Sequence, residues 1–128
     1  MSQLEVVMDV DWEVDSVIWA NFDVIVNGRR YPCGGAWLDD DVERKTVQSF
    51  YWSSEFAESI EAGLETLRIL REHGVIKSPL PVGPEPEDLW LDKDSAWRKA
   101  YDEATGEAQL WAARQLGLEF GSALNSRG

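Results

Sequence analysis

The segment from Met8 to Asp15 has the strictest pattern in the chain, because apolar and acidic residues alternate at every position. Side chains of a β-strand point to opposite faces of the sheet in turn, so this period of two predicts a strand. The apolar set is Met8, Val10, Trp12 and Val14, and the acidic set is Asp9, Asp11, Glu13 and Asp15. The segment therefore indicates a sheet with one face in a core and one acidic face in water.

A second strand is predicted over residues 17–27, where β-branched and aromatic residues are frequent. In an antiparallel hairpin, residues directly opposite each other share a face. Placing Met8 opposite Phe22 joins the two apolar faces, excludes a two-residue loop and favours a loop of odd length. The same register brings the acids of the first strand beside Trp19 and Asp23 on the wet face.

Two further strands are predicted from turn residues and composition. Asn27-Gly28 indicates a type I′ turn, which needs a positive φ at both central residues, so a third strand begins near Arg29. Pro32 and the pair Gly34-Gly35 indicate that this third strand is an edge strand or contains a bulge. A fourth strand is predicted over residues 45–52.

The second half of the chain predicts two helices on either side of a proline-rich segment. Apolar residues at helical spacing, with acids in the first turn and bases in the last, predict a helix from Ser54 to His73. Residues 77–88 contain four prolines and a glycine, which exclude a helix or a central strand and indicate a surface crossing. A second helix is expected from Asp94 or Ser95 to about Leu116.

This order of elements predicts an α+β fold: an antiparallel sheet of about four strands in a meander, with two C-terminal helices packed on one face. We interpret residues 1–128 as one such domain, with a tail after about residue 120 that frays. No run approaches the ~18 apolar residues of a membrane span, so no membrane association is expected. The first residues include acids and do not resemble a signal segment, which favours a cytoplasmic location.

Few residues in the chain are suited to catalysis or to binding a metal ion. The single Cys33 and single His73 fall on different predicted elements and predict neither a catalytic pair nor a zinc site. Asp39–Asp41, predicted as a polar turn, lacks the ligand spacing of a calcium loop. We therefore expect no catalytic residues, no metal and no cofactor.

Charge gives the clearest indication of function. The net charge is −12, and residues 1–43 contain ten acidic and two basic residues. Nucleic-acid binding depends on Lys and Arg, so a basic protein is the more plausible partner. The leading hypothesis is a small acidic binding protein that neutralises such a partner, for example an immunity protein or antitoxin that blocks a toxin nuclease by mimicking phosphates. The predicted partner-binding residues are Asp9, Asp11, Glu13, Asp15, Trp19 and Asp23.

Two alternatives belong to other functional classes. The first is a structural or scaffold domain that self-associates as a homodimer through a sheet edge or the region of Trp90. The second is a small enzyme whose cleft lies between the sheet and the second helix, near Trp97 and Tyr101.

Overall fold

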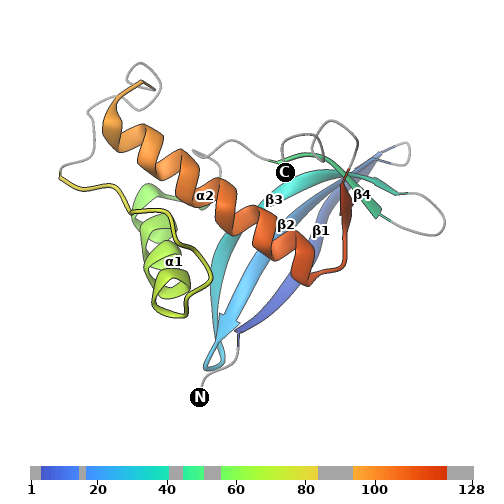
Figure 1. The fold of residues 1–128 in the computed structure, drawn as a ribbon. Coiled ribbons are helices and arrows are strands. Elements are labelled where there is room, and N and C mark those ends of the chain that lie inside the picture. The colour runs from blue at the N-terminus through green and yellow to red at the C-terminus, as the bar shows by residue number, and fades with distance from the viewer. Residues whose placement is uncertain (1–3, 15–16, 41–44, 51–55, 84–93, 121–128) are drawn as a thin grey trace.

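The computed structural model describes residues 4–14, 17–40, 45–50, 56–83 and 94–120. It contains a five-stranded sheet, in the order β1-β2-β3-β4-β5, with the two helices α1 and α2 on one of its faces (Figure 1). The first four strands form the predicted antiparallel meander, and the α+β class is confirmed. The strands are β1 (Leu4–Val14), β2 (Val17–Val26), β3 (Arg29–Asp40), β4 (Lys45–Phe50) and β5 (Glu119–Phe120), and the helices are α1 (Ile60–Glu72) and α2 (Ala96–Gln115).

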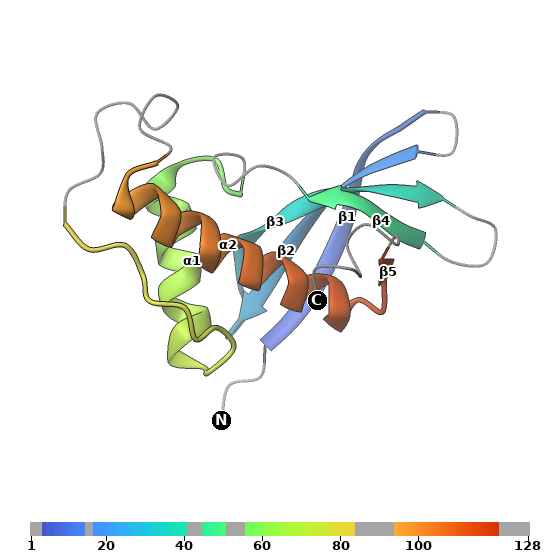
Figure 2. The ribbon, with the colours of Figure 1, turned by 45° about the horizontal axis from the view of Figure 1, so that its top comes forward.

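The short strand β5 was not predicted. It pairs with β4 in parallel, after the chain has passed through both helices (Figure 2). With only two residues, it carries no alternation from which a strand could be recognised.

The central strand β2 separates the two faces of the sheet. Its even-numbered residues are buried beneath the helices, and its odd-numbered residues are partly exposed on the opposite side, which we call the open face. Met8 lies opposite Phe22 and Val10 opposite Ala20, as predicted from the apolar pattern. The buried set is Ile18, Ala20, Phe22, Val24 and Val26.

The turn between β2 and β3 also follows the prediction. Val26 pairs with Arg29 across a two-residue turn, in which φ is 52° at Asn27 and 81° at Gly28. Positive φ at both positions is the requirement of a type I′ turn.

A bulge interrupts β3 at the predicted proline and glycine residues. Asn21 pairs with Gly35 and Asp23 pairs with Pro32, so two residues of β3 lie opposite the single Phe22. Within the bulge, Gly34 has a φ of 89°, and its N–H donates to the carbonyl oxygen of Phe56 at 3.0 Å. The bulge therefore joins β3 to the segment that precedes α1.

A second bulge, in β1, corrects the predicted hairpin. The register shifts between Val10 and Trp12, after which Glu13 lies opposite Ile18 and Val14 opposite Val17. The connection to β2 is therefore two residues long, and the prediction of an odd-length loop was wrong. The extra residue of the bulge shifts the alternation of β1 by one position. Beyond the bulge, residues that unbroken alternation would place on the open face therefore belong to the helix side, and the reverse.

Both helices begin at a serine cap. α1 starts at Ile60, where the Ser59 hydroxyl accepts from Ala62 N–H at 3.1 Å, so the predicted start at Ser54 was wrong. The predicted cap of α2 at Ser95 is confirmed, and this helix continues through Gly106 without a break. Glu58, one of the acids expected in the first turn of the helix predicted from Ser54, lies before the Ser59 cap and therefore outside α1.

The proline-rich crossing is described as far as Gly83 and contains neither helix nor strand there. The carboxylate of Glu107 on α2 accepts from the N–H groups of Lys77 at 2.9 Å and Ser78 at 3.0 Å. Arg71 of α1 donates to the carbonyl oxygens of the same two residues. The start of the crossing is thus held by one side chain from each helix, and the predicted fraying tail lies outside the described residues.

Cys33, Trp97 and Tyr101 belong to the core. The rings of Trp97 and Tyr101 are stacked with centroids 5.4 Å apart and are 8% and 1% exposed. The thiol of Cys33 is buried and lies 3.9 Å from the carbonyl oxygen of Ala108 on α2. Within the described ranges, no helix has the length and apolar character needed to cross a membrane.

Candidate binding pocket on the open sheet face

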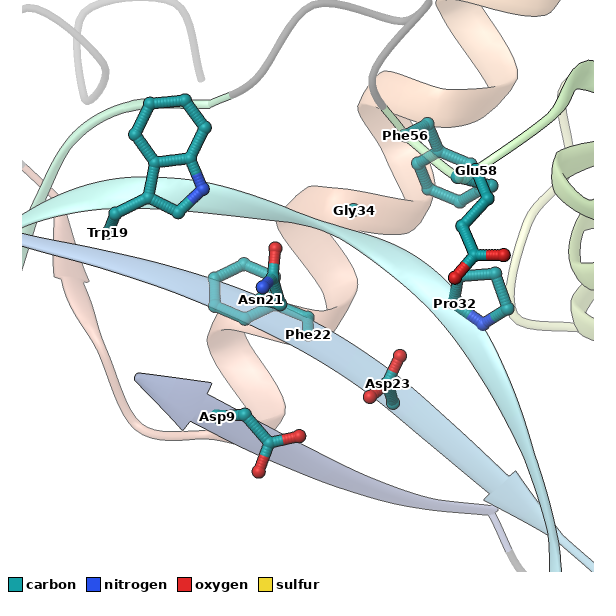
Figure 3. Close-up of a pocket in the computed structure, with 10 residues that line it drawn as sticks. Asp9, Trp19, Asn21, Phe22, Asp23, Pro32, Gly34, Phe56 and Glu58 are labelled. Atoms are coloured by element: carbon teal, nitrogen blue, oxygen red, sulfur yellow. The ribbon is translucent and has the colours of Figure 1, made fainter. Parts of the chain in front are cut away.

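The open face contains a pocket of about 540 Å³, where three strands meet the segment that precedes α1. Figure 3 shows it from the side of the sheet opposite α2, whose ribbon lies behind the strands. We call this cavity the open-face pocket. Its lining residues are Asp9 of β1, Trp19, Asn21, Phe22 and Asp23 of β2, Pro32 and Gly34 of β3, and Phe56, Ala57 and Glu58.

Strand geometry explains why polar side chains gather there. Trp19, Asn21 and Asp23 are alternate residues of β2 and therefore share the open face. Asp9 lies directly opposite Asn21, which places it on the same face. The hydrogen bond from Gly34 to Phe56 holds the preceding segment against β3, so that Glu58 forms another wall of the pocket.

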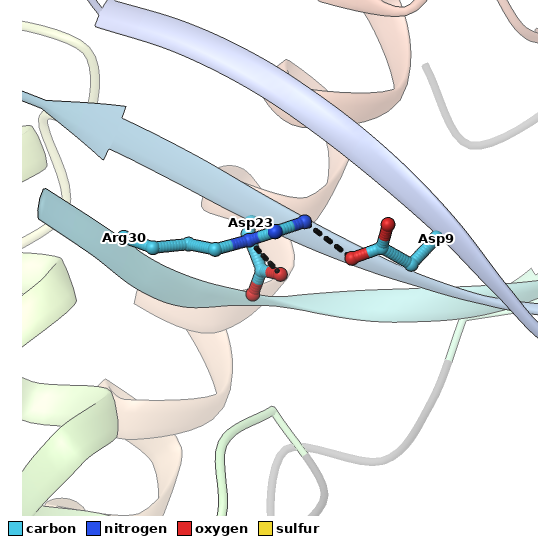
Figure 4. Close-up of polar contacts among 3 residues, drawn as sticks. All are labelled: Asp9, Asp23 and Arg30. Atoms are coloured by element: carbon cyan, nitrogen blue, oxygen red, sulfur yellow. Dashed lines mark hydrogen bonds and ion pairs between the residues drawn. The ribbon is translucent and has the colours of Figure 1, made fainter. Parts of the chain in front are cut away.

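A guanidinium group connects two of the carboxylates. Arg30 of β3 donates from Nε to Asp23 Oδ2 at 2.8 Å, and its Nη2 forms an ion pair with Asp9 Oδ2 (Figure 4). The Asp9 side chain is 59% exposed, whereas that of Asp23 is 21% exposed. One arginine thus links three neighbouring strands across the open face.

Burial raises the pKa of Asp23 above its ordinary value of 3.8, although the hydrogen bond and positive charge of Arg30 act in the opposite direction. The nearby negative charge of Asp9 adds to the increase. Withdrawal from water therefore outweighs the ion pair at Asp23, and the fold holds a partly desolvated carboxylate at the base of the pocket.

Two tryptophans are paired on the open face, and one of them, Trp19, lines the same pocket as these carboxylates. Trp19 and Trp37 are paired across β2 and β3, with ring centroids 4.2 Å apart and an interplanar angle of 78°. Trp12 of β1 lies opposite Trp19 in the register beyond the β1 bulge. The bulge therefore pairs Trp12, rather than Asp11, with Trp19 in the backbone register.

The structure brings together three of the six predicted partner-binding residues, since Asp9, Trp19 and Asp23 all line the open-face pocket. Glu13 is exposed, but it lies opposite the buried Ile18, on the side of the sheet that the helices cover.

The other two predicted residues are not placed in the pocket. Asp11 lies at the β1 bulge and its side chain is not among those described, and Asp15 lies outside the described residues.

The predicted row of acids is therefore corrected. A single row required unbroken alternation from Asp9 to Asp15, and the β1 bulge ends that alternation. Asp9 and Asp23 are also both paired with Arg30 of β3.

Sequence reasoning did not identify Arg30 or Glu58 as site residues. Arg30 could have been found, because the Asn27-Gly28 turn places it opposite Ile25 and thus on the face of Asp23. No comparable sequence pattern indicated Glu58 as a site residue, since it falls within the helix that was predicted from Ser54 to His73.

Comparison with known proteins finds no family model that matches the chain, and no similar curated protein or solved structure. Among the described residues, no three His, Cys, Asp or Glu side chains are grouped so that they could hold a metal ion. The charged groups that line the pocket are the carboxylates of Asp9, Asp23 and Glu58, and the guanidinium of Arg30 pairs with the first two of them. Its described side chains therefore carry an excess of negative charge when ionised.

Proposed function

We propose that this chain is a small acidic binding protein that neutralises a basic protein partner. The open-face pocket receives a basic side chain of that partner. An immunity protein or antitoxin that blocks a toxin nuclease would act in this way. The single observation that carries the proposal is a pocket of about 540 Å³ in which three carboxylates meet a paired tryptophan.

The charge of the whole chain supports the proposal. A net charge of −12 produces a negative field that attracts a basic protein and accelerates its encounter. Such steering acts mainly on the association rate and weakens as salt screens it. An acidic surface in the same position repels nucleic acid, whose phosphates need Lys and Arg.

The tryptophans can contribute binding affinity that charge alone does not provide. Exposed ion pairs contribute little to affinity, whereas an aromatic ring at the centre of an interface is a frequent hot spot. Trp19 is partly exposed and lines the same pocket as Asp9 and Asp23, with Asn21 between it and these carboxylates, and Trp37 packs against it from β3. A basic side chain in the pocket would therefore place its aliphatic portion against Trp19 and its charge near the carboxylates.

The residues assigned to this role differ from the six partner-binding residues that the sequence predicted. Asp9, Asp23 and Trp19 are retained, and Glu58 joins them from the segment before α1. Glu13 is left out because it lies on the helix side of the sheet.

The test begins with affinity capture from the source cells at low salt, using the wild-type chain and the variant Trp19→Ala/Glu58→Gln. A basic protein that the wild type retains and the variant releases supports the proposal. Its association rate must then fall as salt increases. The control Glu103→Gln removes the same charge from the exposed face of α2 and should behave as the wild type. Equal retention by both variants, or an association rate that salt does not change, contradicts the proposal.

The position of β1 favours the second candidate, a self-associating scaffold domain. β1 is at one end of the strand order, and its Val10 is 51% exposed on the helix side. An exposed edge strand can pair with another chain. Size-exclusion chromatography with light scattering separates the candidates, because a stable homodimer that loses its interface on Val10→Lys substitution favours the scaffold.

A further inference from the structure

We infer that the open-face pocket selects a guanidinium group, so that the basic side chain it takes from a partner is arginine rather than lysine. This inference rests on the proposed function and specifies the chemistry of the same site. It is carried by the cavity, by the way Arg30 is held at its edge, and by the aromatic wall.

Arg30 shows how the carboxylates around the cavity bind a cation. Its Nε and its Nη2 donate to different carboxylates, Asp23 on β2 and Asp9 on β1 (Figure 4). A guanidinium is a planar fork with several donors in fixed directions, whereas an ammonium is a compact point charge. Carboxylates spaced across adjacent strands therefore match the fork better than the point charge.

The cavity retains negative charge beyond what Arg30 neutralises. Glu58 lies above Pro32 (Figure 3), and no ion pair to it occurs within the described part of the chain. With three carboxylates and one guanidinium in or beside the pocket, one more cation reduces like-charge repulsion instead of adding to it.

The neutral lining also favours a planar cation. Trp19 forms one wall, and guanidinium groups stack on tryptophan more often than ammonium groups do. The side-chain amide of Asn21, between Asp9 and Trp19 in Figure 3, offers an oxygen that can accept a guanidinium N–H. A volume of about 540 Å³ is sufficient for the end of an arginine side chain.

The experiment is a titration of the ¹⁵N-labelled full chain with L-argininamide at low salt, followed by amide and indole NMR shifts. L-lysinamide, which has the same charge, is titrated in parallel. The expected result is saturable shifts at Trp19, Asn21 and Glu58, with argininamide binding at least about threefold tighter than lysinamide. Equal affinities for both probes, or shifts confined to other surfaces, overturn the inference.

Two variants test the role of charge in the pocket. Glu58→Gln should weaken argininamide binding by about threefold, while the matched control Glu103→Gln on α2 leaves it unchanged. Arg30→Gln should strengthen binding, since it frees Asp9 and Asp23 for the incoming group. The NMR spectrum of each variant shows directly whether the fold is retained. Weaker binding by a folded Arg30→Gln chain contradicts the inference.

This experiment distinguishes the inference from the proposed function. Equal binding of both amides, with a basic partner still captured through Trp19 and Glu58, would remove the preference for arginine and leave the binding protein intact. Failure to capture any basic partner would overturn the function, whatever the small probes do.

Discussion

Gly63 of α1 lies against Tyr101 of α2, and the Tyr101 hydroxyl occupies the space where a side chain at position 63 would begin. Tyr101 is 1% exposed, so it has little room to move away. The two helices can approach this closely because position 63 has no Cβ atom. Glycine is required here for packing, and not for an unusual backbone conformation.

Gly63→Ala should therefore destabilise the fold, by about 1–3 kcal/mol, because the added methyl overpacks the contact with Tyr101. Gly106→Ala is the matched control: it lies within α2, and nothing is within 4 Å of an added Cβ. That control should stabilise the fold by about 0.5–1 kcal/mol, as alanine favours helices. Urea unfolding of both variants measures the difference, and equal effects would contradict the assignment.

Gly34→Ala should be costly for two reasons. The residue has a φ of 89°, and a Cβ there would lie 2.5 Å from Cγ and 2.8 Å from Cδ of the buried Gln109. Left-handed backbone costs about 1–2 kcal/mol, and overpacking adds about 1–3 kcal/mol. Gly28→Ala separates the two effects, because its φ is also positive, at 81°, while its surroundings are empty. If thermal unfolding shows that Gly34→Ala and Gly28→Ala lose equal stability, the contact with Gln109 does not contribute to the cost of Gly34→Ala.

The turns, strands and bulges of the sheet differ in how far the sequence could predict them. The Asn27-Gly28 turn and the alternation of β2 are local signals, and both were confirmed. The β3 bulge was also indicated by local composition. The β1 bulge was not, because Asp11 has no feature that distinguishes it from the other acids of the alternating segment.

The candidate site was predictable only in part, for the same reason. The shared face of Asp9, Trp19 and Asp23 follows from strand alternation and register. Glu58 depends on the segment before α1 lying along β3, which a hydrogen bond between Gly34 and Phe56 secures. Such long-range contacts leave no period in the sequence.

Glu107 should make the stability of the fold depend on acid pH. Burial alone would raise the pKa of Glu107, but hydrogen bonds from the N–H groups of Ser78 and Lys77 outweigh it, so the pKa lies below the ordinary 4.5. Its contribution is therefore present above pH 4.5 and is lost as the pH falls through the lowered value.

Glu107→Gln should remove about 1 kcal/mol of stability at neutral pH, and almost nothing at a pH where the native glutamate is already protonated. Unfolding by urea at the two pH values measures this. Glu103→Gln, on the exposed surface of α2, serves as the control. A Glu107→Gln effect that is the same at both pH values would show that the charge of Glu107 does not hold the crossing.

The thiol of Cys33 should be unreactive in the folded chain. Burial, with a smaller contribution from the charge of Asp23, raises the pKa of Cys33 from 9.0 to about 12. A thiol reagent at pH 8 should therefore react only after unfolding, at a rate set by the opening of the fold. The same chain in urea, where the single cysteine is accessible, provides the reference rate. Rapid labelling without denaturant would contradict the buried position.

The parallel pairing of β4 with β5 determines when this sheet can be completed during synthesis. Thr46 lies opposite Glu119 and Val47 opposite Phe120, so the outer side of β4 obtains this neighbour only after both helices have been translated. A ribosome that stalls before residue 119 would carry a nascent chain whose β4 edge lacks that partner and is open to neighbouring chains. Such stalled chains are where we expect aggregation of this protein to begin.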